Sequence, residues 1–414
     1  MKRQSIFLLL SLAAMTAQAG QVPHLDPEMT GEEYRSIFRK LEHRQDFQKK
    51  LVSDPLNEIL ELGKRNLDWI EVINSHRDDQ HKLQLTTPET TAAYPIEAPG
   101  YSNRSIIMKN LETLKTQMPK AMAEVIFGSG ALPDTAPVDD QTFIENARTM
   151  NRVYEAASRW LLEEPYLDDY KQFAASDIRG YYFLDKEAGL KDKLDHWSSL
   201  DEQTRKKYSE WLTGECVNSM LSMNACQAQL AKAIQSRQVL AYHEKYAGTA
   251  RQVYNDFFEL QNPRPEVIWN YKNPDVMEMP FTLPERQDVQ DWFKANVEDE
   301  YRMDNWSLKI GFNNNRNLAK VVFEPGATPH VNGLGGDTIT MDANRPLQEY
   351  AVTWTIRHEF GHVLGFPDCY VEFYDEKNAV MINYQIDITS LMCSRRGHLQ
   401  SRHFEQLKKH YYKG

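Results

Sequence analysis

The sequence lacks three features that would define whole classes of protein. Beyond its first residues it has no long apolar run, so no transmembrane segment is predicted. Its 48 basic residues are outnumbered by 59 acidic ones, for a net charge of −11, which argues against binding to nucleic acid or an anionic membrane surface. Only four cysteines occur among 414 residues, and their spacing fits no familiar zinc-binding cysteine cluster.

The first 19 residues have the pattern of a signal peptide. Lys2 and Arg3 give a positive start, Ile6 to Ala14 is apolar but too short to span a bilayer, and small residues end at Ala19. We therefore expect cleavage after Ala19 and export to the periplasm or the extracellular medium, between which the sequence does not choose. The residue directly after the cleavage site is Gly20 and not a cysteine, which argues against a lipid anchor.

Export changes the interpretation of the four cysteines. In an oxidising compartment an even number predicts two disulfides, and four cysteines allow three pairings. Closeness along the chain favours Cys216 with Cys226 and Cys369 with Cys393.

The length of the chain predicts more than one domain, because single cores stop growing at about 250–300 residues. Asn262-Pro263-Arg264-Pro265 interrupts a helical pattern and marks the expected boundary. We expect residues 20–262 to form a mainly helical region and residues 263–414 a second, α+β domain. Helices are expected over Thr30–His76, Ser105–Phe127, Thr142–Glu163 and Leu230–Leu260, a loop over Thr86–Gly100, and inward positions at Leu41, Leu51, Leu56, Ile59, Leu60 and Leu67.

Two functions remain open for the helical region. It could be a propeptide that blocks a site in the second domain until it is removed, or a retained module that binds a protein partner or substrate. Its length, and the absence of a basic processing stretch before the second domain, favour the retained module.

The most informative motif reads HEFGHVLGFPD and begins at His358. His358 and His362 stand four residues apart, so on a helix they share one face and can both reach a single Zn²⁺. Glu359 places a carboxylate beside the metal as a general base. Gly365 permits a positive-φ turn that would bring Asp368 back as a third ligand. The alternative is a core helix whose two histidines bond to the backbone.

This pattern resembles the metzincin zinc endopeptidases, and its aspartate resembles the snapalysin-like branch. The resemblance covers about the last 150 residues. It implies one catalytic Zn²⁺ on His358, His362 and Asp368, with Glu359 as the general base. It also implies a Met-turn, for which Met392 is the candidate. Some members carry a tyrosine two residues after that methionine, but Ser394 stands here, so no tyrosine role carries over.

The predicted elements before and after the motif follow the order that this resemblance implies, namely a twisted mixed sheet with an antiparallel edge strand, an active-site helix and a closing helix. Strands are expected at Val267–Tyr271, Trp306–Phe312, Ala319–Phe323, Thr328–Asn332 and Asp337–Met341, and helices at Leu283–Tyr301, Leu347–Leu364 and Ser401–His410. Pro329 suits an edge strand.

An edge strand offers unpaired backbone groups to which an extended peptide can add. By resemblance, Thr328 to Leu334 would bind the main chain of a protein or peptide substrate. His330 in this segment is expected to face solvent rather than act in catalysis.

The sequence thus predicts a secreted zinc endopeptidase that uses a metal-activated water. Two alternatives remain: an exported binding protein with a structural zinc site, and a zinc amidase acting on cell-wall peptide. Structural zinc sites normally have a fourth protein ligand, and none is evident in the sequence.

Overall fold

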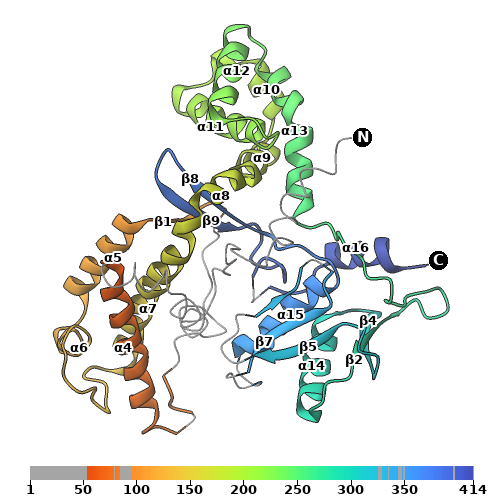
Figure 1. Ribbon diagram of the computed structural model, residues 1–414. Helices are drawn as coiled ribbons and strands as arrows, with labels where there is room; N and C mark the ends of the chain where they lie inside the picture. The colour runs from red at the N-terminus through yellow and green to blue at the C-terminus, as the bar shows by residue number, and fades with distance from the viewer. Residues whose placement is uncertain are drawn as a thin grey trace.

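The computed structural model describes residues 54–78, 80–83, 96–324, 329–333, 335–343, 347, 350–394 and 397–413. The described chain is a mixed α+β protein with helices in its first part and small sheets in its second (Figure 1). The predicted signal peptide, the first part of the predicted helix over 30–76, and residues 86–95 of the predicted loop lie outside the described residues.

The first helical lobe packs around one buried cluster, which we name the N-terminal cluster. In α4 (Leu56–Asn74) the predicted inward positions Leu56, Ile59, Leu60 and Leu67 are all buried, because apolar residues recur every three or four positions. The predicted helix over residues 105–127 is wrong in one respect: it is divided at Pro119 into two helices, since proline lacks the amide that a helix interior needs. The helices are α4, α5 (Arg104–Gln117), α6 (Lys120–Ile126) and α7 (Asp140–Glu163).

A second helical lobe, which we name the distal lobe, is drawn in green at the top of Figure 1 and has its own core, the distal cluster. The Cys216–Cys226 disulfide, as predicted, joins two of its helices. The predicted helix over residues 230–260 is wrong: a turn with Arg237 at φ +58° separates α12 from α13. Its elements are α9 (Arg179–Asp185), α10 (Leu190–Asp195), η3 (Trp197–Ser199), α11 (Glu202–Val217), α12 (Met223–Gln235) and α13 (Val239–Asp256). Three short elements precede it, η1 (Glu164–Tyr166), α8 (Leu167–Gln172) and η2 (Phe173–Ser176), and Tyr170 of α8 is buried in the N-terminal cluster.

Two three-stranded sheets form the body of the C-terminal region. One has the order β2-β4-β3 and the other β5-β7-β6, and a bridge between Phe281 and Ala319 links them. The β2–β4 and β5–β7 pairs are parallel, whereas β6 pairs antiparallel with β7 at the sheet edge. Their elements are β2 (Val276–Thr282), α14 (Gln287–Glu300), β3 (Arg302–Met303), β4 (Trp306–Asn313), β5 (Lys320–Glu324), β6 (His330–Val331), β7 (Thr338–Asp342), α15 (Tyr350–Val363) and α16 (Ser401–Tyr411).

The predicted strand at residues 267–271 is wrong. Only isolated bridges form there, such as Ile268 with Glu278, and the continuous strand is β2, a few residues later. Val267 and Trp269 are nevertheless buried. The alternation of apolar residues therefore indicated which side chains are buried in the core, but it did not indicate a continuous strand.

A hairpin connects the helical lobes to the C-terminal region. It consists of β8 (Tyr370–Asp375) and β9 (Val380–Gln385), and β9 also pairs antiparallel with β1 (Gly100–Ser102). Met381 of the hairpin belongs to the N-terminal cluster, and buried Glu372 forms an ion pair with buried Arg159 of α7. The Tyr384 hydroxyl donates a hydrogen bond to Asp177 Oδ1 at 2.7 Å. The two parts of the chain therefore share a sheet and buried side chains (Figure 1).

Candidate metal centre

Three ligand atoms meet at the C-terminal end of α15. His358 Nε2 and His362 Nε2 lie 3.1 Å apart, and Asp368 Oδ1 lies 3.2 Å from each of them. Among the described residues these three form the one group of histidine, cysteine or carboxylate side chains that could hold a metal ion. The structure therefore brings together all three ligands predicted from the sequence.

The turn after α15 brings Asp368 back to the histidines. Gly365 has φ +94°, its amide donates to the His362 carbonyl at 2.9 Å, and the Phe366 amide donates to the Gly361 carbonyl at 3.0 Å. This is a Schellman ending, which satisfies the last helical carbonyls and reverses the chain. A Cβ at Gly365 would lie 2.8 Å from the Asn262 carbonyl oxygen, so glycine is required both for its conformation and for space.

Backbone carbonyls set the orientation of both histidines. His358 Nδ1 donates to the Leu391 carbonyl at 2.9 Å, and His362 Nδ1 donates to the Phe366 carbonyl at 2.8 Å. A carbonyl oxygen can only accept, so each Nδ1 carries a proton and each Nε2 faces the other ligands. Hydrogen bonds of this kind are the usual outer support of metal-binding histidines. The backbone hydrogen bonds expected for two core histidines are therefore present. They are compatible with metal binding, because they use Nδ1 and leave both Nε2 atoms facing Asp368.

The spacing of the three atoms fits a small divalent cation. For tetrahedral Zn²⁺ with bonds of about 2.0–2.1 Å, ligand atoms lie about 3.3 Å apart. The observed separations of 3.1 and 3.2 Å are close to that value. Imidazole and carboxylate ligands suit zinc and several other transition metals, so the donor set fits zinc without identifying it.

Electrostatics at the three ligands favour a bound cation. Burial by itself would lower the pKa of His362, but the charge of Asp368, its hydrogen bond, the charge of Glu359 and the Phe366 carbonyl together outweigh burial and raise that pKa to about 9. Burial alone would raise the pKa of Asp368, but the charge of His362 and hydrogen bonds from both histidines hold it well below its usual range. The carboxylate is therefore ionised at neutral pH, and a metal ion bound here would replace a proton that these groups share.

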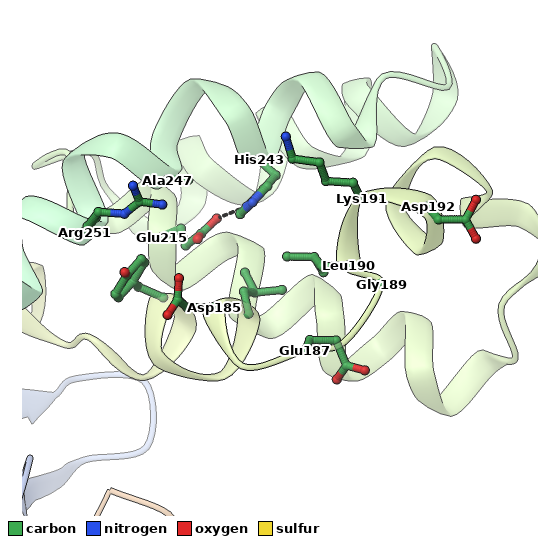
Figure 2. Close-up of a pocket in the computed structure, with 12 residues that line it drawn as sticks. Asp185, Glu187, Gly189, Leu190, Lys191, Asp192, Glu215, His243, Ala247 and Arg251 are labelled. Carbon is green, nitrogen blue, oxygen red and sulfur yellow. Dashed lines mark hydrogen bonds and ion pairs between the residues drawn. The ribbon is translucent and has the colours of Figure 1, made fainter.

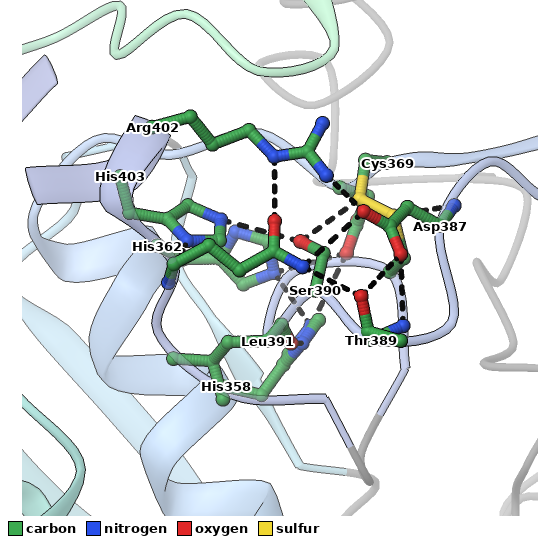
Figure 3. The surroundings of a disulfide bond; sticks show 12 residues. His358, His362, Cys369, Asp387, Thr389, Ser390, Leu391, Arg402 and His403 are labelled. Carbon is green, nitrogen blue, oxygen red and sulfur yellow. Dashed lines mark hydrogen bonds and ion pairs between the residues drawn. A yellow bond between two sulfur atoms is a disulfide. The ribbon is translucent and has the colours of Figure 1, made fainter. Parts of the chain in front are cut away.

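The predicted Met-turn packs under the ligand helix. Met392 is buried, and its sulfur would lie 2.3 Å from a Cβ placed on Gly361, between the two histidines on α15. The Cys369 amide donates to the Met392 carbonyl at 3.0 Å, and the predicted Cys369–Cys393 disulfide is present. The residue after the third ligand is therefore covalently tied to the residue after Met392 (Figure 3).

A neutral histidine supports the same turn from behind. Burial and the positive charge of Arg402 lower the pKa of His403 to about 3. Its Nδ1 accepts a hydrogen bond from the Gln400 amide, so its Nε2 donates to Ser390 Oγ at 3.2 Å (Figure 3). This pair fixes the start of the segment that supplies the Leu391 carbonyl to His358. His403 was not predicted from the sequence, because only the folded chain brings it to its partner Ser390.

Glu359 lies on α15 directly after the first ligand. Its side chain is only 6% exposed and forms no hydrogen bond or ion pair with any described residue. A carboxylate in such a place has acceptor capacity left for water or substrate. Its role as the general base remains a prediction.

Residues 329–333 of the segment predicted to bind substrate lie within the described residues. β6 is the terminal strand of its sheet and lies against α15, and His330 is exposed, as expected. The Gly335 amide, on the turn after β6, donates to the His362 carbonyl at 2.8 Å. Thr328 and Leu334, the ends of the predicted segment, lie outside the described residues.

The hairpin between the third ligand and the Met-turn was also missed. β8 begins two residues after Asp368, and β9 ends five residues before Ser390. Two β-rich runs separated by Asp-Glu-Lys-Asn could have indicated it.

Comparison with models of known protein families, with curated proteins and with solved structures finds no match for this chain. Within the described residues, no helix is both long enough and apolar enough to cross a membrane.

Proposed function

We propose that this chain is an exported zinc endopeptidase of the metzincin type. The observation that carries the proposal is the convergence of His358, His362 and Asp368, with Glu359 close by on the same helix. Catalytic zinc sites typically have three protein ligands, whereas structural sites have four. The group has three members among the described residues, which favours catalysis over a structural role.

The surrounding elements support the family assignment as a proposal. Parallel pairing of β2 with β4 and of β5 with β7, an antiparallel edge strand, a ligand helix, a glycine turn and a methionine under that helix follow the order that the resemblance implies. The two disulfides suit an oxidising compartment, in agreement with the predicted export.

The proposed mechanism assigns one role to each group. When bound, Zn²⁺ supplies Lewis acidity, which polarises a carbonyl and makes water more acidic. His358, His362 and Asp368 hold it, and the Leu391 and Phe366 carbonyls keep the two imidazoles in one tautomer. Glu359 accepts a proton from the attacking water and passes it to the leaving amine. The substrate main chain adds to β6 in an extended conformation.

We infer that the helical half, the predicted region of residues 20–262, is retained in the working enzyme. Removing it would separate β1 from β9, leave Glu372 without Arg159, and expose Met381. Breaking a buried ion pair by removal of one partner costs about 3–5 kcal/mol. A removable propeptide would be expected to leave the remaining sheet and core intact.

The test is hydrolysis of casein by purified protein, followed by mass spectrometry of the products. Peptide-bond cleavage should stop with phenanthroline and return when zinc is added. A parallel incubation with peptidoglycan distinguishes the cell-wall amidase, which would release muropeptides and leave casein intact. Stoichiometric zinc with neither activity would instead support the exported binding protein with a structural zinc site.

A further inference from the structure

A single buried histidine of α16 contacts the two chain segments that orient the ligand histidines. His403 is only 2% exposed, and it does not belong to the ligand group. Its Nδ1 accepts a hydrogen bond from the Gln400 amide at 2.8 Å, and its Nε2 donates one to Ser390 Oγ at 3.2 Å. Both ring nitrogens are therefore occupied, which holds the ring in one orientation and leaves neither nitrogen for a metal ion.

The first of these segments leads to His358. Ser390 is fully buried, and the next residue, Leu391, supplies the carbonyl oxygen that accepts a hydrogen bond from His358 Nδ1 at 2.9 Å. The hydrogen bond from His403 anchors Ser390, and it thereby limits the direction in which the adjacent Leu391 carbonyl can point (Figure 3).

The second segment leads to His362. The His403 ring packs edge-to-face against the Phe366 ring, with centroids 5.3 Å apart and an interplanar angle of 87°, an arrangement that aromatic rings prefer. Phe366 is buried, and its carbonyl oxygen accepts a hydrogen bond from His362 Nδ1 at 2.8 Å. The packing of His403 therefore limits the position of the residue that orients the second ligand.

Neither contact depends on pH in the neutral range. Burial and the positive charge of Arg402 lower the pKa of His403 to about 3, so its ring is uncharged. An uncharged ring with an accepting Nδ1 carries its one proton on Nε2, which is the atom that faces Ser390. His403 therefore acts through its shape and its hydrogen bonds rather than by exchanging a proton.

We propose that His403 is a positioning residue for both histidine ligands. It acts on His358 through Ser390 and on His362 through Phe366. This inference rests on the proposed metal site, and it gives two of the three ligands a common outer support. Replacement of such outer groups typically lowers metal affinity about 10–100-fold. An ordinary core histidine would stabilise the fold but would leave metal affinity unchanged.

The test is the zinc affinity of the protein of residues 20–414, measured at one fixed pH by competition with a chromophoric chelator. His403→Ala removes both contacts and should weaken zinc binding about 10–100-fold. His403→Phe keeps an aromatic ring against Phe366 but loses the donor to Ser390, whereas His403→Gln keeps a donor for Ser390 but loses the ring. Each of these two variants should weaken zinc binding less than His403→Ala does.

Imidazole NMR signals distinguish the two contacts. The Nδ1–H protons of His358 and His362 are each held by a carbonyl oxygen, so their chemical shifts in the zinc-loaded protein report on these two hydrogen bonds. His403→Phe should shift mainly the His358 signal, and His403→Gln mainly the His362 signal. A role confined to stability would shift neither. Should His403→Ala fail to fold, these two variants still give a result.

Two control variants separate this role from general damage to the protein. Tyr411→Phe, on the same helix, removes a buried hydrogen bond to the Leu364 carbonyl, which neither ligand histidine uses. His243→Ala removes a histidine that bonds to Glu215 in the distal lobe, on the wall of a cavity (Figure 2). Both controls should bind zinc as tightly as the wild-type protein.

Unchanged zinc affinity in folded His403→Ala, an equal loss of affinity in Tyr411→Phe, or unshifted ligand signals in both single-contact variants would overturn the proposal. Failure of the wild-type protein to bind zinc would overturn the proposed function as well. Because peptide hydrolysis is not measured, zinc binding without peptidase activity would reject only the proposed catalysis and would leave the role of His403 standing.

Discussion

At the candidate metal centre, the chemistry of individual side chains depends on backbone atoms. Each histidine can act as a ligand only because a carbonyl oxygen holds its Nδ1 proton, and these carbonyls belong to Leu391 and Phe366. Asp368 then provides the negative charge that attracts a cation or, in its absence, a proton.

Replacing Glu359 by Gln should preserve metal binding and remove turnover. The amide cannot accept a proton, and general acid–base catalysis typically contributes about 10²–10⁴-fold. Hydrolysis of a casein-derived peptide should therefore fall by at least that factor, whereas zinc content measured by mass spectrometry should stay at one per chain. Gln at Glu405, an exposed position of α16, serves as the control. Undiminished cleavage by Glu359→Gln would reject the mechanism.

Zinc affinity should rise with pH. The metal-free site holds a proton on His362, whose pKa is raised to about 9, and that proton must leave before the nitrogen can bind metal. Below this pH, affinity should fall about tenfold per pH unit for each displaced proton. Competition with a chromophoric chelator at pH 6, 7 and 8 measures the slope.

The raised pKa of His362 also makes the stability of the metal-free protein depend on pH. A pKa raised above the unfolded value of about 6.5 stabilises the metal-free protein fully below that pH, and this contribution is lost as pH rises through 9. Zinc affinity that does not change with pH would contradict the assignment of the shared proton.

At the level of elements, the turn after α15 and the Met-turn act as one unit. The disulfide between Cys369 and Cys393 closes a separation of 24 residues, and removing it should lower stability by about 3 kcal/mol and also weaken zinc binding. The double change Cys369→Ala with Cys393→Ala tests this by urea denaturation and zinc titration.

The second disulfide provides a matched control. Cys216 and Cys226 close a separation of 10 residues in the distal lobe, so their replacement by alanine should also cost about 3 kcal/mol but leave zinc affinity unchanged. Equal loss of zinc affinity in both double variants would show that the first bridge has no local role.

Gly365→Ala should destabilise the end of the ligand helix. A left-handed conformation costs alanine about 1–2 kcal/mol, and its Cβ would also press on the Asn262 carbonyl oxygen. Gly248→Ala in α13, where a Cβ meets nothing within 4 Å, should instead stabilise by about 0.5–1 kcal/mol. Thermal denaturation of both variants gives the comparison, and equal midpoints would contradict it.

At the scale of the whole molecule, the helical half and the C-terminal region form a common core. Ile96, Ile178, Phe258 and Leu260 precede residue 263 and are buried in the same cluster as the metal-site helix. Each large apolar side chain contributes roughly 1.5–3 kcal/mol, so their joint loss is comparable to a typical total stability of about 5–15 kcal/mol.

A chain of residues 263–414 alone should therefore not fold cooperatively. Thermal denaturation followed by circular dichroism should show no sharp transition for this fragment, in contrast to residues 20–414. A folded, active fragment would instead favour the removable propeptide, as would an intact mass from the natural compartment that lacks residues 20–262.

Much of the candidate metal centre could be predicted from the spacing of nearby residues in the sequence. Two histidines four apart on a helix and a glycine that allows a positive φ depend on short-range geometry, and the structure has both. The two disulfides also followed from closeness along the chain. The helix over 230–260 and the strand at 267–271 were wrong, because apolar periodicity reports which side chains are buried but not where the backbone turns.

The amino-acid order was sufficient to place His358, His362 and Asp368 together, because all three lie within eleven residues and the helix and turn between them are local structures. Folding alone paired β9 with β1, more than 270 residues away, and placed Glu215 beside His243 on the wall of a cavity. Contacts of that kind depend on how whole elements pack, since no repeating pattern along the chain encodes which distant surfaces will meet.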